Sequence, residues 1–269
     1  MKICNHHDFG PVTGYELGYS PIGRPLMTVF FYLVDGLVID TGQRHMRQAV
    51  FDILDRRRPD RVLVTHHHED HSGNADAISA RYDIAVMGHF LTAQKLAHPF
   101  KIRPYQHLVW GKADPVHIIP ANSSIQTRSG HLVPIHTPGH SKDHTVYLET
   151  QHGWLFSGDL YIGDRIKYFR ADESMHDQID SLKTILKCDF DALFCCHHPS
   201  VTNGKRRIQN KLAFLEDFFG TVQQLRQNGM VEKAIIQQLD RHQDRLVRWV
   251  TLGNACFANM VRSALKTEN

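Results

Sequence analysis

Residues His66 to His71 read His-His-His-Glu-Asp-His, so six consecutive side chains can all exchange a proton or bind a metal ion. In an extended segment, residues two apart point to the same side, so His66 and His68 can bind one ion together. A turn after them would bring Asp70 and His71 toward a second ion. The sequence contains 20 histidines, and histidine is the commonest metal ligand. The cluster therefore predicts a metal centre.

Further polar residues stand at the ends of predicted strands later in the chain. They are His140 in HTPGHS, Asp159 in FSGDL, and His197 or His198 in CCHHP. Strand ends that meet at one edge commonly assemble a site. Asp159 has one oxygen for each of two ions and could bridge them. We expect three ligands for one ion and three for the other, namely His66, His68 and His140, and Asp70, His71 and His197.

Such a ligand set predicts hydrolytic chemistry. Two Zn²⁺ ions, for which Fe or Mn could substitute, lower the pKa of a shared water from about 15.7 toward roughly 7. The resulting hydroxide would attack a carbonyl or phosphoryl centre. Asp70 would hold the second ion and orient the nucleophile, so it is the candidate catalytic residue. The sequence contains no Gly-x-Ser-x-Gly motif that would indicate a serine nucleophile instead.

The elements that must position these residues alternate between strand and helix in the first part of the chain. A hairpin turn at Asp35-Gly36 follows one strand, and a buried strand over 61–65 delivers the histidine cluster. Short strands separated by Gly and Pro turns follow, and then a helix with Ser174 as its N-cap. After Pro199 the apolar spacing is helical throughout. We therefore predict an α+β fold with two domains, 1–203 and 204–269, the second helical.

The motifs YLVDGLVIDTG, VLVTHHHEDHSGN, HTPGHS and FSGDL, with a histidine before Pro199, occur in that order. In this the sequence resembles the metallo-β-lactamase superfamily, over almost all of residues 20–200. The resemblance implies a four-layer αβ/βα sandwich with the metals at one edge and supports the seven ligands above. The last motif usually reads Gly-His-Gly, whereas here Cys196, His197 and His198 occupy it. Alignment on Pro199 favours His197 over His198.

The resemblance also bears on residues around the ligands. In relatives the counterpart of Asp40 supports the ligands by hydrogen bonds, and a simple turn-forming role is the alternative. His67 and Glu69 alternate with the ligands along the chain, so they are expected to be exposed or to support the ligands. His144, four residues after His140, is expected to contact the substrate or to support a ligand. The segment after Asp159 lies beside the pocket in the family, so it could bind a substrate carboxylate or phosphate. Its candidate substrate contacts are Lys167 and Tyr168.

Composition bears on nucleic-acid binding, membrane spans and disulfides. A net charge of +3 over 269 residues does not predict a surface that coats nucleic acid. No apolar run approaches the ~20 residues of a membrane span, and five cysteines give no disulfide pattern, so we expect a cytoplasmic protein with reduced thiols. The oligomeric state is not predicted.

The helical tail resembles that of the glyoxalase-II-like and lactamase-β-like branches, whose substrates include glutathione thioesters and single-stranded RNA. We favour a small-molecule ester or thioester over a phosphodiester in nucleic acid. The alternatives are a single-stranded RNA endonuclease, a mononuclear iron dioxygenase acting on sulfur compounds, and a binding module without activity.

Overall fold

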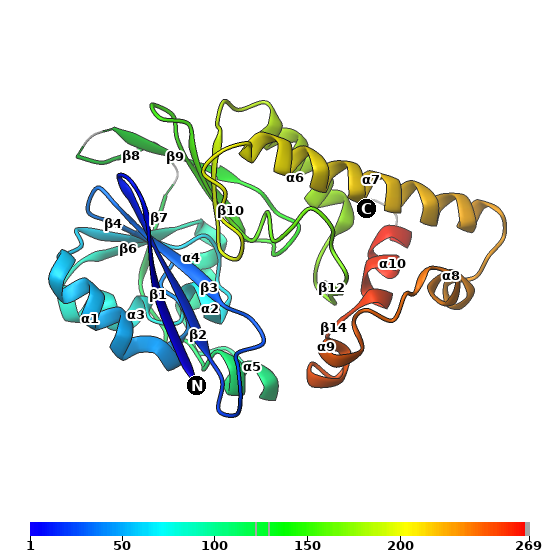
Figure 1. The fold of residues 1–269 in the computed structure, drawn as a ribbon, viewed down its shortest axis with the longest axis horizontal. Coiled ribbons are helices and arrows are strands. Elements are labelled where there is room, and N and C mark those ends of the chain that lie inside the picture. The colour runs from blue at the N-terminus through cyan, green and yellow to red at the C-terminus, as the bar shows by residue number, and fades with distance from the viewer. Residues whose placement is uncertain (122, 129, 267–269) are drawn as a thin grey trace.

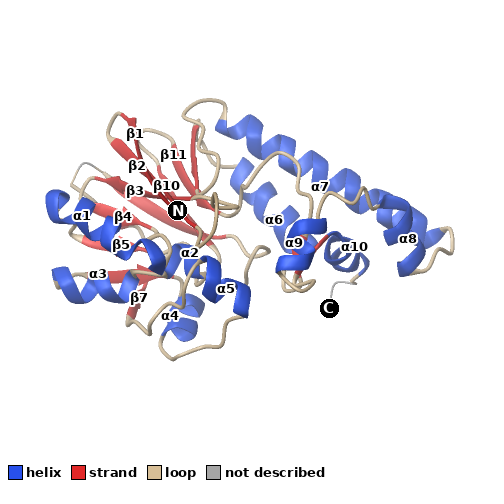
Figure 2. Cartoon of the chain, turned by 60° about the horizontal axis from the view of Figure 1, so that its bottom comes forward, coloured by secondary structure: helices blue, strands red, loops and turns tan. Residues whose placement is uncertain are grey.

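The computed structural model describes residues 1–121, 123–128 and 130–266. Two β-sheets pack face to face, and helices cover the outer face of each, which gives the expected αβ/βα sandwich (Figures 1 and 2). Helices α1 and α3 lie against the first sheet, and α6 and α7 lie against the second. The α+β class and the four layers predicted from the sequence are therefore confirmed.

The first sheet has the strand order β1-β2-β3-β4-β5-β6-β7. The strands from β1 to β4 are antiparallel, and those from β4 to β7 run parallel. Parallel strands send their carboxyl ends to one edge, so β4 and β5 deliver their following loops side by side. The bounds are Lys2–Phe9, Val12–Tyr19, Val29–Val34, Leu37–Ile39, Arg61–Leu63, Ala85–Gly88 and Ile118–Pro120.

The second sheet has the order β13-β11-β10-β9-β8, in which β11 and β13 are parallel and the remaining pairs antiparallel. From β8 to β11 and then β13, its strands span Ile125–Gln126, His131–His136, Thr145–Glu149, Trp154–Gly158 and Ala192–Cys195. A separate two-stranded pair joins β12 to β14, that is, Phe169–Arg170 to Ala255–Cys256. This pair ties the loop after Asp159 to the C-terminal region.

The helices follow the order that the sequence predicts, with short ones added. A 3₁₀ turn, Arg44–Met46, leads into α1, and Ser174 caps α6 by accepting the backbone N–H of Asp177. The helices α1 to α5 are Arg47–Arg57, Glu69–Ser72, Ala75–Tyr82, Phe90–Leu96 and Pro104–Val109. The helices α6 to α10 are Met175–Leu186, Gly204–Gln227, Glu232–Leu239, Arg245–Val250 and Phe257–Leu265.

Alternation of side chains along the central strands explains the layers. In β3, Phe30 and Tyr32 face the second sheet, whereas Val29 and Phe31 face the helices. Between the sheets, Phe156 stacks on Phe194 with ring centroids 5.1 Å apart, and both meet Tyr32 edge-on. These aromatic contacts fix how one sheet lies on the other.

The C-terminal helices begin at α7, whose first residue, Gly204, adjoins the predicted boundary at residue 203. Ile208 and Leu215 of α7 belong to the same hydrophobic cluster as Leu182 of α6 and Leu155 of β11. The helical extension thus shares a core with the second sheet, and the division of the chain into two domains stays a prediction. Within the described residues, no helix has the length and apolar character that crossing a bilayer requires.

Some elements escaped prediction because their sequences lack a local signal. The β1–β2 hairpin carries many exposed polar residues, and β12 and β14 are two residues each and pair across more than eighty positions. Such short strands depend on their partner rather than on their own propensity.

Replacing Phe156 by Ala tests the core between the sheets. Phe156 is 1% exposed, so we expect the free energy of unfolding to fall by about 3–5 kcal/mol, measured from urea denaturation at fixed metal content. The control is Trp249→Ala, because Trp249 is 77% exposed and its loss should change stability by less than about 0.5 kcal/mol. Equal stabilities for the two variants would contradict this assignment of the core.

Candidate metal centre

The predicted ligands follow the ends of strands from both sheets and meet at one edge of the sandwich. The loop after β5 carries His66 and His68 and enters α2, which carries Asp70 and His71. The remaining three come from the second sheet: His140 precedes β10, Asp159 follows β11, and His197 follows β13. The structure therefore brings together all seven residues that the sequence singled out.

Three imidazole nitrogens form the first group. His66 Nε2 lies 2.8 Å from His68 Nδ1, and His140 Nε2 lies 3.0 Å from the same atom. The three side chains are buried, and one nitrogen from each falls within 4.8 Å of the others. Three imidazole nitrogens around one point match the three protein ligands of a catalytic zinc site, which leaves a fourth position open.

Asp159 joins this first group to a second. Its Oδ2 lies 3.3 Å from His140 Nε2, and its Oδ1 lies 3.5 Å from His71 Nε2 and 3.4 Å from His197 Nε2. One oxygen thus faces each group, which is the arrangement expected of a bridging carboxylate. Asp70 is at the margin of the second group, with Oδ2 3.8 Å from His71 Nε2.

The hydrogen bonds behind the ligands indicate which nitrogen of each ring carries the proton. His71 Nδ1 donates to Asp40 Oδ2 at 2.8 Å, and His197 Nδ1 donates to the carbonyl of Thr28 at 2.7 Å. His66 Nδ1 donates to Thr65 Oγ1 at 3.0 Å. Burial lowers the pKa of His71 and of His197, but Cys196 and Asp159 beside the first ring, and Asp159 beside the second, raise both above the ordinary value. The Nε2 lone pair of each ring therefore points into the cluster once a metal ion takes the place of the proton.

Unpartnered atoms give a further test of whether a cation fits. His71 Nε2 and Asp159 Oδ1 are fully buried, and neither has a hydrogen-bond partner among the described residues. A buried acceptor left unsatisfied costs roughly 1–3 kcal/mol. Two acceptors 3.5 Å apart cannot satisfy each other, but a cation between them would satisfy both. The residues present therefore fit a metal centre.

The electrostatic state of the ligands suits metal binding. Burial holds the pKa of His66 and His68 well below the ordinary value, so both rings are neutral and keep a lone pair. Burial alone would raise the pKa of Asp159, but His71, His197 and His140 around it hold that pKa well below its usual range. Asp159 is thus an anion among imidazoles.

Asp40 is the support of the second group, as the resemblance implied. Its Oδ1 accepts the backbone N–H of Thr65 at 2.8 Å, and its Oδ2 accepts His71 Nδ1–H and the hydroxyl of Thr65 at 3.0 Å. The buried thiol of Cys196 donates to Oδ2 at 3.3 Å. Asp40 therefore orients two neighbouring histidines at once, His71 directly and His66 through Thr65.

His67 and Glu69, expected to be exposed or supporting, are both buried. The backbone N–H and Nδ1–H of His67 donate to Asp143 at 2.9 and 2.8 Å, while Lys95 donates to Nε2 at 3.0 Å. This network holds the loop between the two ligands His66 and His68. Asp143 was missed in the sequence, although its place three residues after His140 was a signal.

His144 also supports the site. Its Nδ1 shares a hydrogen bond with the hydroxyl of Thr137 at 2.9 Å, and its Nε2 accepts the backbone N–H of Asp159 at 3.0 Å. Burial lowers the pKa of His144 to about 3, so the ring stays neutral and can accept that bond. With both nitrogens occupied and no exposed surface, His144 has no nitrogen to offer a substrate, and the expected substrate contact is replaced by a bond that positions Asp159.

Gly158 makes this arrangement possible. Its φ is +47°, and an added Cβ would lie 2.8 Å from His144 Nε2 and 2.9 Å from Thr65 Cβ. A side chain here would displace the residues that hold Asp159 and His66.

His197 and His198, the two candidate ligands of the last motif, have different surroundings. His197 reaches Asp159, whereas His198 is exposed and its backbone N–H donates to Cys195 Sγ at 3.1 Å. The structure thus places His197 at the cluster. Cys195 and Cys196 are buried, as expected.

Lys167 and Tyr168, expected to contact substrate, are not among the residues that line the cavity beside His68, and their role stays a prediction. Lys167 is exposed and lines a cavity of about 940 Å³ between the loop after Asp159 and helices α7 and α10, which contains none of the seven candidate ligands. Tyr168 is half-buried, and burial together with the nearby Glu173 and Asp244 raises the pKa of its hydroxyl. Arg170, two residues further, lines a cavity beside His68 instead.

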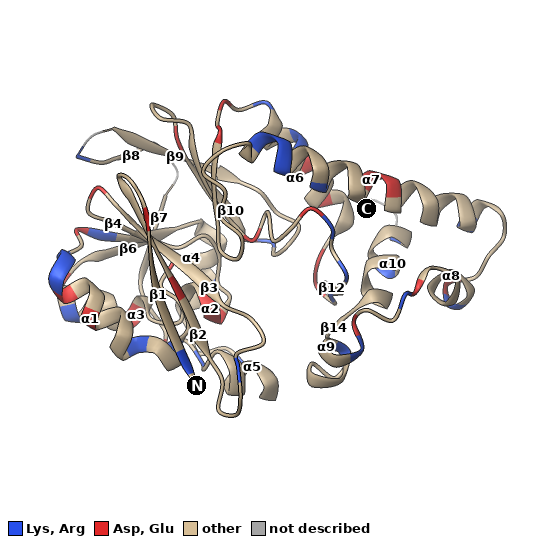
Figure 3. Cartoon of the chain, in the orientation of Figure 1, with Lys and Arg blue, Asp and Glu red and all other residues tan. Residues whose placement is uncertain are grey.

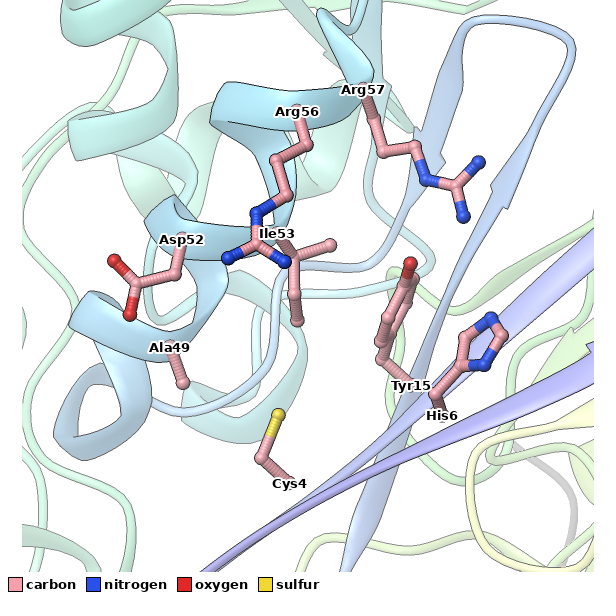
Figure 4. Close-up of a pocket in the computed structure, with 8 residues that line it drawn as sticks. All are labelled: Cys4, His6, Tyr15, Ala49, Asp52, Ile53, Arg56 and Arg57. Carbon is pink, nitrogen blue, oxygen red and sulfur yellow. The ribbon is translucent and has the colours of Figure 1, made fainter.

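A groove of about 470 Å³ lies between β1, β2 and α1, and Figure 4 shows Arg56 and Arg57 above it with Cys4, His6 and Tyr15 opposite. None of its lining residues is a candidate ligand. This groove is therefore separate from the metal centre.

A sandwich of this topology with clustered histidines and aspartates at one edge defines a metal-binding hydrolase fold. The model of the family described as "Metallo-beta-lactamase superfamily" matches residues 5–197, and the chain belongs to this superfamily. Among its relatives, a hydroxyacylglutathione hydrolase from Serratia proteamaculans is 28% identical over 76% of this chain and 74% of its own length. A β-lactamase-like protein 2 homolog from Drosophila melanogaster is 28% identical over 67% and 62%.

Solved structures with low identity share the fold. A β-lactamase domain protein from Burkholderia ambifaria superposes with a TM-score of 0.68 at 16% identity, over 97% of this chain and 88% of that one. A metallo-β-lactamase from Pontibacter korlensis gives a TM-score of 0.63 at 16% identity, over 80% and 100%.

Replacing Asp40 by Asn tests the support of the second ligand group. An amide has one acceptor oxygen where Asp40 uses two, so His71 should lose its orientation. We expect about 10- to 100-fold weaker binding of one of two ions, measured by competition with a chromogenic chelator.

Asp83→Asn is the matched control, because Asp83 is exposed and, like Asp40, has a positive φ (53° against 60°). Unchanged affinity for both ions in Asp40→Asn would contradict the role assigned to Asp40.

Proposed function

We propose that the protein hydrolyses a small-molecule thioester or ester with two metal ions as its cofactor. The observation that carries the proposal is Asp159, whose two oxygens face His140 on one side and His71 and His197 on the other. Two groups joined by one carboxylate support a pair of ions rather than one. Relatives named hydroxyacylglutathione hydrolase support a thioester as the substrate.

The donor set supports zinc as the metal, with Fe or Mn as the other outcomes of metal analysis. Five imidazole nitrogens with two carboxylates are ligands that Zn²⁺ commonly takes. We assign His66, His68 and His140 to one ion and Asp70, His71 and His197 to the other. Bound there, the ions supply the acidity that makes water a nucleophile at neutral pH and the charge that polarises a carbonyl oxygen.

The chain's own residues have separate tasks in this proposal. Asp70 is the carboxylate at the margin of the ligand cluster, so it is placed to accept a hydrogen bond from the attacking water and orient it. His144 and Asp40 keep Asp159 and His71 in place. The buried walls exclude bulk water from the edge where the strands end.

The alternatives considered from the sequence have less support. A mononuclear iron dioxygenase has no need of the second group, yet His71, Asp159 and His197 converge. Basic and acidic segments are interleaved along α1 and α7 (Figure 3), a pattern that favours a small molecule over a nucleic-acid strand.

A panel of thioesters, esters, lactones, β-lactams and single-stranded RNA, given to protein of known metal content, tests the proposal. We expect thioester or ester turnover that disappears with chelation and returns with Zn²⁺. Asp70→Ala should lower kcat by about 10²- to 10⁴-fold on the best substrate.

Asp52→Ala is the control for Asp70→Ala, because Asp52 is an exposed carboxylate of α1 that lines the separate groove, which contains no candidate ligand. Full activity of metal-free protein, or turnover of RNA alone, would overturn the proposal.

A further inference from the structure

A cavity of about 310 Å³ opens directly beside the first ligand group. It shares His68 with that group, so a molecule whose carbonyl lies at the ligands can extend into the cavity. Its walls come from the histidine loop, the segment around α5, β12 and the turn before β14. The residues that matter below are His68, Glu69, Lys101, Arg103, Arg170 and Asn254.

Arg170 is the feature that makes this cavity a candidate binding site. Its side chain is 23% exposed, and its Nε lies 3.3 Å from Asp172 Oδ1. In the described part of the chain the side chain makes no other hydrogen bond or ion pair, so both terminal nitrogens are free to bind a ligand. A guanidinium that presents two parallel N–H groups matches a carboxylate.

The surrounding charges reinforce this preference. Lys101 and Arg103 add two exposed cationic side chains to the rim, neither with an ion-pair partner in the described part of the chain. Opposing them, Asp172 already pairs with Arg170, and Glu69 is buried with Oε2 bonded to Gln106 at 2.9 Å. Three cationic side chains thus line the cavity against two carboxylates that already have partners. The cavity is therefore suited to an anion.

The C-terminal extension holds Arg170 where it is. Arg170 pairs with Ala255 across the β12–β14 ladder, and the backbone N–H of Ala171 donates to the carbonyl of Asn254 at 2.8 Å. Asn254 also donates through Nδ2 to the Tyr105 hydroxyl at 2.9 Å, which links the extension to the α5 side of the cavity. The extension thus completes the wall rather than covering only the second sheet.

We propose that this cavity binds a carboxylate group of the substrate through Arg170, and that the substrate is a thioester or ester carrying such a group near the bond that is cleaved. The proposal rests on the hydrolase function above and names its substrate class. Arg170 is assigned to specificity, whereas the metal ligands carry out the reaction.

The test compares three synthetic thioesters with one acyl skeleton that end in a carboxylate, its methyl ester or a phosphate. Wild-type protein should prefer the carboxylate, and Arg170→Gln should raise KM for it about 10- to 100-fold while leaving kcat and the methyl ester nearly unchanged. Arg170→Lys should restore part of the preference, because it keeps the charge but not the two parallel donors.

Arg248→Gln is the matched control, since Arg248 is an exposed arginine of α9 with no ion pair in the described part of the chain. Thermal melts of all variants confirm that they are folded. Equal use of carboxylate and methyl ester, unaffected by Arg170→Gln, would overturn this inference and leave the hydrolase function intact. A preference for phosphate would replace the carboxylate assignment. Turnover of none of the three would overturn this inference, and it would overturn the hydrolase function as well only if the panel above also gave no thioester or ester turnover.

Discussion

Lone pairs of several buried imidazoles directed into one small space are the interaction on which the rest of the structure depends. Without a metal ion, His71 Nε2 and Asp159 Oδ1 are buried polar atoms that have no hydrogen-bond partner among the described residues. Each costs roughly 1–3 kcal/mol, so the chain must stabilise the arrangement elsewhere. Metal binding would return that free energy, which ties the stability of this edge to its chemistry.

The core between the sheets is the main source of that stabilisation, and it also sets the site's geometry. His66 and His71 follow strands of the first sheet, whereas Asp159 and His197 follow strands of the second. Their separation therefore depends on how Phe156 and Phe194 pack against Tyr32. Tyr32 also donates its hydroxyl to the carbonyl of Cys195, two residues before the ligand His197. Packing far from the solvent edge thus fixes the positions of the ligands.

The convergence of the seven candidate ligands could be predicted from the sequence because each stands in a motif with a physical signal. Histidines two apart after a buried strand and an aspartate after another strand are local patterns, and strand ends meet at one edge. The supporting residues were harder to find. Glu69 is buried because its carboxylate bonds to Gln106, and the His67 ring is held by Asp143 and Lys95. These contacts join segments that are distant in sequence.

The substrate contacts are the part of the site that sequence alone places least firmly, for a physical reason. The segment after Asp159 carries several cationic residues, and sequence alone does not say which one faces the ligands. The β12–β14 ladder decides this, because pairing of Arg170 with Ala255 fixes its register. Lys167, three residues earlier, consequently lines a different cavity. Local pattern cannot reveal a pairing between two-residue strands that lie so far apart in the chain.

The metal ligands and the substrate contact Arg170 are held by different parts of the chain, which affects how the fold can diversify. The ligands come from strand ends of the sandwich, while the side chain that selects an anion is held by the C-terminal region. The superposition on the Burkholderia ambifaria protein spans 97% of this chain and so must include most of residues 204–269, whereas that on the Pontibacter korlensis protein spans 80%. Changes in the extension would reposition Arg170 with little effect on Asp40, His144 or the ligands they hold. Substrate preference could therefore change while the metal centre stays as it is, because the two are stabilised by different contacts.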